Sequence, residues 1–223
     1  MVVDAGAIPR GFRTRLARRA QRAGLTIPDD LADGLIAYYQ LLSLWNQRIN
    51  LTSIGEPDQA IDRLLLEPLL AARQIDVAAP SAIDIGSGGG SPAIPLKLAL
   101  PAMTLVMVES KARKTAFLRE AVRQLQLVGV RVETARYEEL LVRPELHDAM
   151  DVVTLRAVRV DGRTLANLQA FLKPAGKLLL FRALGASDIP GLPPTLSISA
   201  TVPLIESLRS RLLVIEKRRP GAV

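Results

Sequence analysis

The sequence lacks cysteine altogether and contains a single histidine, His147, among its 223 residues. The missing thiols exclude disulfides, thiolate metal sites, iron–sulfur clusters and cysteine nucleophiles. A lone histidine also excludes a metal centre built from several imidazoles, and His147 lies in a polar stretch that favours a surface loop. We therefore expect no metal site.

Long apolar runs are missing as well. Hydrophobic residues make up 49% of the chain, yet no uninterrupted run reaches the ~18 residues of a transmembrane helix. The first residues lack the apolar stretch of a secretory signal. Together with the absence of cysteine, this indicates a globular protein of the cytoplasm, with no membrane partner, which we expect to be monomeric.

Charge is distributed unevenly along the chain, whose net charge is +7. The stretch that follows the first few residues is rich in arginine and contains no acidic residue. Arginine grips phosphate groups in a bidentate manner, so such an arm favours contact with nucleic acid over a merely solvated terminus. The predicted nucleic-acid-binding residues are Arg10, Arg13, Arg15, Arg18, Arg19 and Arg22.

Hydrophobic periodicity divides the chain near residue 80. Before it, apolar residues recur at steps of three and four between Leu31 and Ile49, which predicts an amphipathic helix, and a second helix is expected over 59–75. After it, short apolar runs alternate with amphipathic ones, as in βαβ units. Strands are expected at 82–85, 104–108, 130–134, 151–155, 177–181 and 211–216, the last antiparallel, and helices at 92–100, 112–127 and 164–172.

This alternation predicts an α/β fold with a mostly parallel, Rossmann-like sheet and an N-terminal helical extension. Residues 1–80 would form the basic arm and the extension, and residues 81–223 the cofactor-binding domain. Ligands in such sheets bind beyond the carboxyl ends of the strands, near the point where the strand order switches.

A glycine-rich segment follows the first predicted strand, with glycine at Gly86, Gly88 and Gly90. Glycines at the junction of a strand and a helix allow a tight turn and a close approach of the backbone to a nucleotide-like cofactor. The dinucleotide fingerprint requires a third glycine where Ser91 stands, and no P-loop is present. The remaining pattern is typical of S-adenosylmethionine (SAM) binders, with Ser91 expected to cap the helix that begins at Pro92.

Further candidates lie at the ends of the next strands. Glu109 ends the second strand, where an acid accepts hydrogen bonds from ribose hydroxyls. Tyr137 and Glu138 follow the third strand, where they would contact the adenine, although a simple helix cap is the alternative. Arg156 ends the fourth strand and would position a phosphate or a base, or line the cofactor pocket.

The chain resembles the bacterial glucose-inhibited division protein B family. The matching segments are LLSLWNQRINLTSI (41–54), AIDIGSGGGSPAIPL (82–96), KTAFLREAVRQLQL (114–127), ARYEEL (135–140), VVTLRAV (152–158) and RLLVIEK (211–217). The resemblance implies a class I SAM-dependent methyltransferase that modifies N7 of a guanine in 16S ribosomal RNA. It also implies SAM contacts at Gly86, Ser91, Tyr137, Glu138 and Arg156.

The residue inventory is compatible with that reaction. Without cysteine, methylation of a pyrimidine C5 lacks its usual nucleophile, and no Asn/Asp-Pro-Pro-aromatic motif for exocyclic amines follows the fourth strand. Guanine N7 has a free lone pair and no proton to lose, so Arg156 is expected to position groups without acting as a general base. The candidate cofactor-binding residues are Asp84, Gly86, Gly88, Gly90, Ser91, Glu109, Tyr137, Glu138 and Arg156.

Two other functions are compatible with the sequence. A SAM-dependent enzyme acting on a small molecule would use the same glycine segment but leave the arginine-rich arm unexplained. A catalytically silent RNA-binding protein would explain why the family's Arg-His-x-x-Asp-Ser signature is replaced by the segment from Arg63 to Pro68. Because aromatic residues are only 4% of the chain, few bases can be stacked, and the target RNA is expected within the small ribosomal subunit.

Overall fold

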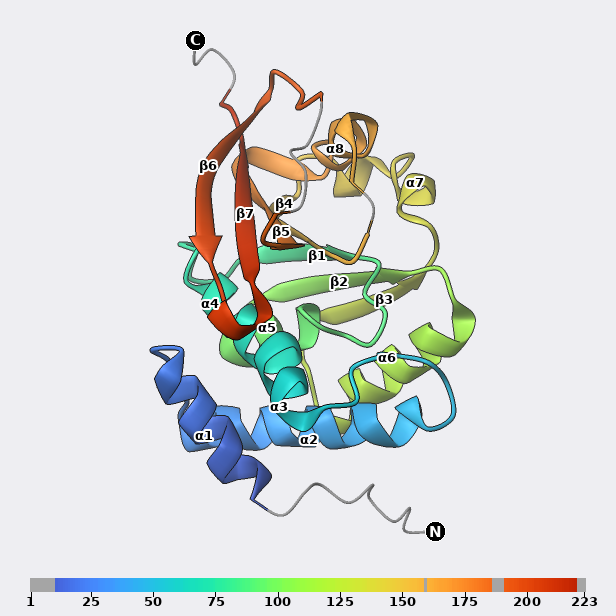
Figure 1. The fold of residues 1–223 in the computed structure, drawn as a ribbon. Coiled ribbons are helices and arrows are strands. Elements are labelled where there is room, and N and C mark those ends of the chain that lie inside the picture. Colours follow the sequence, from blue (N-terminus) through green and yellow to red (C-terminus); the bar gives the residue numbers. More distant parts are fainter. Residues whose placement is uncertain (1–10, 159, 186–190, 220–223) are drawn as a thin grey trace.

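The computed structural model describes residues 11–158, 160–185 and 191–219, which form a twisted sheet flanked by helices (Figure 1). The strands are β1 (Ser81–Ile85), β2 (Thr104–Glu109), β3 (Val130–Thr134), β4 (Met150–Arg156), β5 (Leu172–Ala183), β6 (Leu196–Pro203) and β7 (Ser210–Lys217). The α-helices are α1 (Phe12–Arg22), α2 (Asp29–Asn46), α3 (Pro57–Ala60), α4 (Glu67–Ala72), α5 (Ala93–Ala99), α6 (Ala112–Gln124), α7 (Tyr137–Leu140) and α8 (Gly162–Leu168). A π-helical segment, η1 (Ile61–Leu66), joins α3 to α4, and two 3₁₀ turns are η2 (Pro144–Leu146) and η3 (Glu206–Leu208).

The seven strands lie in the order β3-β2-β1-β4-β5-β7-β6. Strands β1 to β5 are parallel, whereas β7 is antiparallel to both β5 and β6. This confirms the predicted Rossmann-like α/β fold. The strand order reverses at β1, which lies between β2 and β4, so the carboxyl ends of these three strands define the expected ligand site.

Every predicted strand is present, including the antiparallel last strand, but β6 was not predicted. Strand β6 pairs only with β7, so it forms the edge of the sheet, and most of its side chains are half-buried or exposed. Its sequence, LSISATVP, alternates apolar and polar residues up to the proline at its end, which is the pattern of a half-buried strand, but it has no continuous apolar run of the kind that marks the central strands.

The N-terminal arginine-rich stretch also differs from the prediction, because it is the docked helix α1. Phe12, Leu16 and Ala20 are buried and recur every four residues, which places them on one face of the helix. The ring of Phe12 stacks on Tyr39 of α2 with centroids 4.6 Å apart. The arginines therefore occupy the remaining faces of a packed helix.

The helical extension packs directly on the sheet. One hydrophobic cluster includes Leu16 of α1 and Leu35 of α2 together with Leu105 and Leu179 of the sheet. A second cluster, on the other side, contains Val108, Leu155 and residues of α8. The division into residues 1–80 and 81–223 stays a prediction. In the described ranges, no helix combines the length and apolarity needed to cross a bilayer.

Candidate active site

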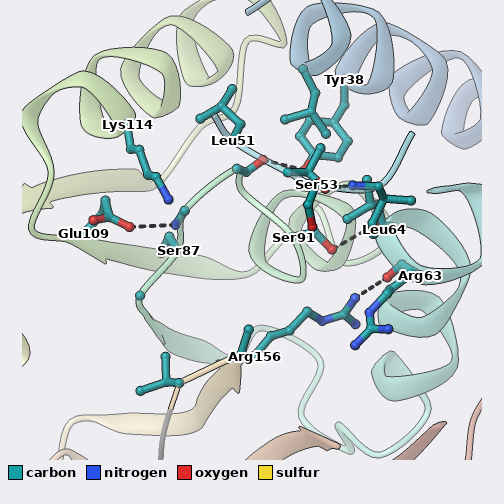
Figure 2. A pocket seen from close by; sticks show the side chains of 18 of the residues that line it. Tyr38, Leu51, Ser53, Arg63, Leu64, Ser87, Ser91, Glu109, Lys114 and Arg156 are labelled. Atoms are coloured by element: carbon teal, nitrogen blue, oxygen red, sulfur yellow. Dashed lines mark hydrogen bonds between the residues drawn. The ribbon is translucent and has the colours of Figure 1, made fainter. Parts of the chain in front are cut away.

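A cavity of about 560 Å³ opens at the carboxyl ends of β1, β2 and β4, where the strand order reverses. Figure 2 shows side chains from the sheet and from the helical extension converging on it. The sheet side contributes Gly86, Ser87, Gly88, Gly89, Ser91, Glu109, Lys114, Arg156, Ala157 and Val158. The extension contributes Tyr38, Leu42, Leu51, Thr52, Ser53, Ile54, Gln59, Arg63 and Leu64.

The three predicted glycines share the left-handed backbone conformation, with φ of 74° at Gly86, 52° at Gly88 and 87° at Gly90. They differ in what surrounds them. A Cβ atom on Gly88 would meet only the carbonyl oxygen of Gly86, at 3.7 Å, because this residue faces the open cavity. A Cβ atom on Gly90 would come within 2.6 Å of Ile94, so this glycine is required for packing against α5 and does not line the cavity.

Glu109 lies at the end of β2, with its carboxylate at the cavity wall as predicted. Its Oε2 accepts a hydrogen bond from the backbone N–H of Gly88 at 3.1 Å, and its Oε1 accepts one from Lys111 at 2.8 Å. These two bonds hold both the carboxylate and the glycine segment in place. Since an ionised carboxylate has about four acceptor sites, capacity remains for hydroxyl donors in the cavity.

Asp84 lies beneath the glycine segment and does not line the cavity. Its side chain is buried, and its Oδ1 accepts a hydrogen bond from the hydroxyl of Thr154 at 2.5 Å. Its Oδ2 has no hydrogen-bond partner among the residues that the structure describes. Burial raises the pKa of the Asp84 carboxyl group, and hydrogen bonds from Ser87 and Thr154 only partly oppose that shift.

Ser91 lines the cavity, but it does not cap the helix that follows. Helix α5 begins at Ala93, and its N-cap position is Pro92. The hydroxyl of Ser91 instead donates a hydrogen bond to the carbonyl oxygen of Leu64, at 2.9 Å. The predicted cap is therefore wrong, because the serine is used to attach the glycine segment to η1.

Arg156 also lines the cavity, but its guanidinium is engaged by the chain itself. Its Nη1 donates to the carbonyl oxygen of Arg63, and its Nη2 lies 3.0 Å from the Oε2 of Glu67. The guanidinium carbon lies 4.2 Å from the centre of the Phe181 ring. Burial lowers the pKa of Arg156 and the nearby Glu67 opposes this.

These contacts revise the predicted role of Arg156. The guanidinium points toward η1 and α4, so it fastens the end of β4 to the helical extension. Glu67 belongs to the segment that departs from the family signature, and here it supplies the buried counter-charge. The prediction that Arg156 positions a substrate phosphate is not supported by this geometry.

Tyr137 and Glu138 are in the short helix α7, which follows β3, and neither lines the cavity. Tyr137 packs against the second hydrophobic cluster, and Glu138 is exposed. The cap of this helix is formed by neighbouring residues, since Glu139 accepts a hydrogen bond from the backbone N–H of Arg136 at 2.8 Å. A contact of Tyr137 or Glu138 with the cofactor stays a prediction.

Sequence reasoning missed the part of the cavity wall that the extension provides. The hydroxyl of the buried Tyr38 donates to the carbonyl oxygen of Gly89 at 2.6 Å, and burial raises the pKa of this tyrosine. A Cβ atom on Gly89 would come within 3.1 Å of Leu42 and 3.3 Å of the Leu51 carbonyl oxygen. Tyr38 belongs to the apolar face of the predicted helix, but no sequence signal indicated its hydroxyl contact.

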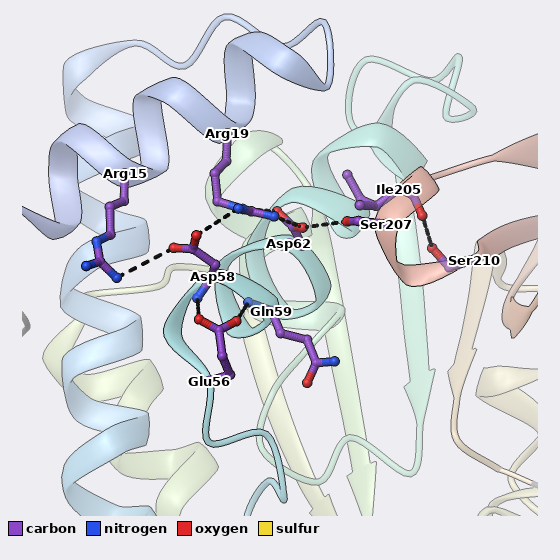
Figure 3. Close-up of polar contacts among 9 residues, drawn as sticks. All are labelled: Arg15, Arg19, Glu56, Asp58, Gln59, Asp62, Ile205, Ser207 and Ser210. Carbon is purple, nitrogen blue, oxygen red and sulfur yellow. Dashed lines mark hydrogen bonds and ion pairs between the residues drawn. The ribbon is translucent and has the colours of Figure 1, made fainter.

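The arginines of α1 face acidic residues of their own chain. Figure 3 shows Arg19 held between two aspartates, with its Nε 2.6 Å from Asp62 Oδ1 and its Nη1 2.9 Å from Asp58 Oδ2. The hydrogen bond to Asp62 raises the pKa of Arg19. Arg15 is 3.6 Å from the other oxygen of Asp58.

Arg13 contacts Asp29 and Asp33 of α2. The contact of Arg19 with RNA phosphates stays a prediction, and the ion pair with the buried Asp62 opposes it. Arg13 and Arg15 are likewise paired. Arg18 and Arg22 are exposed. Arg10 lies outside the described residues. No acid–histidine cluster suited to a metal ion occurs in the described ranges.

Comparisons with a family model and with individual relatives identify the same family. A family model described as rRNA small subunit methyltransferase G (GidB) matches residues 32–193. A relative with the name ribosomal RNA small subunit methyltransferase G, from Stenotrophomonas maltophilia strain K279a, is 36% identical over 192 residues, which cover 82% of this chain and 84% of the relative. A protein of the same name from Roseiflexus sp. strain RS-1 is 37% identical over 165 residues, covering 68% and 70%.

Solved structures support the fold. A SAM-dependent methyltransferase from Aquifex aeolicus aligns with a TM-score of 0.54 at 13% identity, covering 78% of this chain and 97% of that one. TrmN from Thermus thermophilus aligns with a TM-score of 0.54 at 19% identity, covering 67% of this chain and 48% of that one. At such identities the similarity concerns the fold alone.

Proposed function

The chain belongs to the rRNA small subunit methyltransferase G family, and from this premise we propose that it transfers the methyl group of SAM to N7 of a guanine in 16S ribosomal RNA. The observation that carries the proposal is the cavity at the switch point, where the open space beside Gly88 adjoins the carboxylate of Glu109. A small-molecule donor and an acceptor base would meet at this edge of the sheet.

The residues of the cavity fit SAM. The backbone at Gly88 permits close approach, because no side chain lies within 4 Å of where its Cβ atom would be, whereas at Gly86 that space is bounded by the side chain of Val158, 2.9 Å away. The carboxylate of Glu109 supplies acceptors for the two ribose hydroxyls. When bound, SAM supplies an electrophilic methyl group on a positively charged sulfur. The predicted contacts of Tyr137 and Glu138 with the adenine remain part of this proposal.

The titratable groups around the cavity are compatible with methylation of an atom that carries no proton. Glu109 already accepts two backbone hydrogen bonds, and the hydroxyl of Tyr38 is bonded to Gly89. The other titratable groups in the wall are the cations Arg63, Lys114 and Arg156. No group of this set is arranged as a general base, and guanine N7 needs none, so proximity and alignment would supply the catalysis.

An RNA substrate bears on where and in what form the enzyme acts. We propose that the RNA is presented within the small ribosomal subunit and that the enzyme acts as a cytoplasmic monomer. The four phenylalanines, three tyrosines and one tryptophan leave little capacity for stacking on several exposed bases. A folded ribonucleoprotein surface would then supply part of the recognition.

The test is the transfer of labelled methyl from SAM to small subunits and to free 16S rRNA that lack the modification, followed by nucleoside analysis. We expect labelled 7-methylguanosine at one position. Label in any other nucleoside would contradict the acceptor atom. RNA binding without methyl transfer would favour the catalytically silent RNA-binding protein. Label found only in small molecules would favour a SAM-dependent enzyme that acts on a small molecule.

A further inference from the structure

A second cavity, of about 480 Å³, lies beside the first, between the C-terminal end of α2 and the start of α6. Lys114 lines both cavities, so the second one adjoins the proposed methyl-transfer site. The wall combines residues that are far apart in the sequence. They are Arg48, Ile49, Asn50, Ser110, Lys111, Ala112, Arg113 and Lys114.

The charged residues of this wall are all basic. Arg48, Lys111 and Arg113 are exposed and Lys114 is half-buried. Among the residues that the structure describes, none of the four forms an ion pair. The first turn of α6 contains no acidic residue that would compete for a bound anion. These cations are therefore available to a ligand.

We infer that this basic cavity binds the phosphate backbone of the substrate RNA next to the target guanine. The inference rests on the proposed function, which supplies RNA as the partner. Four positive side chains that form no ion pair among the described residues match a polyanion, and the asparagine amide and serine hydroxyl add neutral donors. No aromatic side chain lines the cavity, so it offers contacts to phosphates rather than stacking of bases.

This assignment moves the RNA contact away from helix α1. Both surfaces are rich in arginine, but Arg13, Arg15 and Arg19 are paired with aspartates of their own chain. A phosphate would have to displace these carboxylates, whereas in the basic cavity it meets unpaired charges. The cavity also adjoins the methyl-transfer site through Lys114, whereas no described residue of α1 lines either cavity.

The test compares two double variants that remove the same charge from exposed arginines. Arg48→Gln with Arg113→Gln alters the basic cavity, and Arg18→Gln with Arg22→Gln alters α1. RNA affinity is measured by titration of unmodified 16S rRNA at several salt concentrations. For the cavity variant we expect a roughly tenfold weaker affinity and a salt slope reduced by about 1.4, from ~0.7 for each lost contact to single-stranded RNA. The α1 variant is expected to retain the wild-type affinity and slope, because no described residue of α1 lines the basic cavity or the methyl-transfer site, although Arg18 and Arg22 are exposed.

Two further readouts separate this inference from the proposed function. The cavity variant should have an unchanged affinity for SAM and, on small subunits, a raised KM with an unchanged kcat. An equal loss of RNA affinity in both double variants, or a larger loss in the α1 variant, would overturn the inference. Weakened SAM binding by the cavity variant would also overturn it. If the wild type transfers no methyl while the cavity variant still loses RNA affinity, the proposed function fails and the surface assignment stands.

Discussion

Helix α1 and the basic cavity at the start of α6 contain the same kinds of residue but differ in what faces them. On α1, three of the arginines that drew attention in the sequence contact aspartates contributed by α2, α3 and η1. In the cavity, the basic side chains face an open space. The comparison shows that a cluster of charge in a sequence does not reveal whether that charge is available to a ligand.

The difference follows from packing. Helix α1 buries one apolar face, and this brings its arginines against η1, where Asp62 is itself buried. A buried carboxylate needs a cation and hydrogen bonds, and Arg19 supplies both, with a further hydrogen bond from Ser207 at 3.2 Å (Figure 3). The same η1 segment carries Arg63 and Leu64 at the wall of the active-site cavity.

The largest expected effect is on the stability of the fold, at the ion pairs of helix α1. Arg19→Met leaves Asp62 buried without its counter-charge, so we expect unfolding to become easier by ~3–5 kcal/mol. Denaturant unfolding measures the change. The matched control is Arg18→Met on the same helix, which is exposed and should shift stability by no more than about 0.5 kcal/mol. Equal midpoints for the two variants would show that the aspartates do not require Arg19.

A smaller effect is expected at Arg156, a buried cation that contacts a carbonyl oxygen, a carboxylate and an aromatic ring. Arg156→Lys keeps the charge but cannot contact the carbonyl of Arg63, the carboxylate of Glu67 and the ring of Phe181 together. We expect a loss of about 1–3 kcal/mol in unfolding free energy. Loss of methyl transfer with unchanged stability and SAM affinity would contradict this structural role and restore the predicted role in positioning the substrate.

The smallest effect is expected at an ion pair on the surface of α6. Hydrogen bonds from Arg123 and then Gln124 lower the pKa of Glu120 to about 2. A lowered carboxyl pKa stabilises the fold above the ordinary value near 4.5, and that stabilisation is lost as the pH falls toward 2. Glu120→Gln should change the melting temperature little at pH 7 and should remove this component of the acid dependence. A large loss at pH 7 would contradict the view that exposed pairs contribute little.

Local patterns predicted the fold well. The strands of the sheet centre were found because their side chains are buried on both faces and read as short apolar runs, and Gly86 and Gly88 marked the turn that follows β1. Strand β6 was missed because its apolar and polar residues alternate, whereas the central strands were identified from continuous apolar runs. Helix α1 did carry a signal, since Phe12, Leu16 and Ala20 are four residues apart, but the arginines between them dominated the interpretation.

Contacts between distant segments could not be predicted. Arg19 and Asp62 are 43 residues apart, and nothing local indicates that they meet. The same holds for Arg156 and the carbonyl of Arg63, 93 residues apart, and for Tyr38 and Gly89, 51 apart. The place of Glu109 at the cavity could be predicted because the end of β2 lies next to the end of β1 in any sheet of this order, whereas side-chain partners depend on how the extension docks.

The most direct test of the account is calorimetric titration of SAM into the wild-type protein and two variants. Gly88→Val fills the open space beside the glycine segment and strains a left-handed backbone position, Glu109→Gln alters the proposed ribose acceptor, and Gly11→Val is a control at an exposed glycine that is also left-handed and has open space around it. We predict binding to the wild type and the control, no detectable binding to Gly88→Val, and an affinity at least roughly tenfold lower for Glu109→Gln. Unchanged affinity in both site variants, with both folded as judged by circular dichroism, would contradict the assignment of this cavity to the methyl donor.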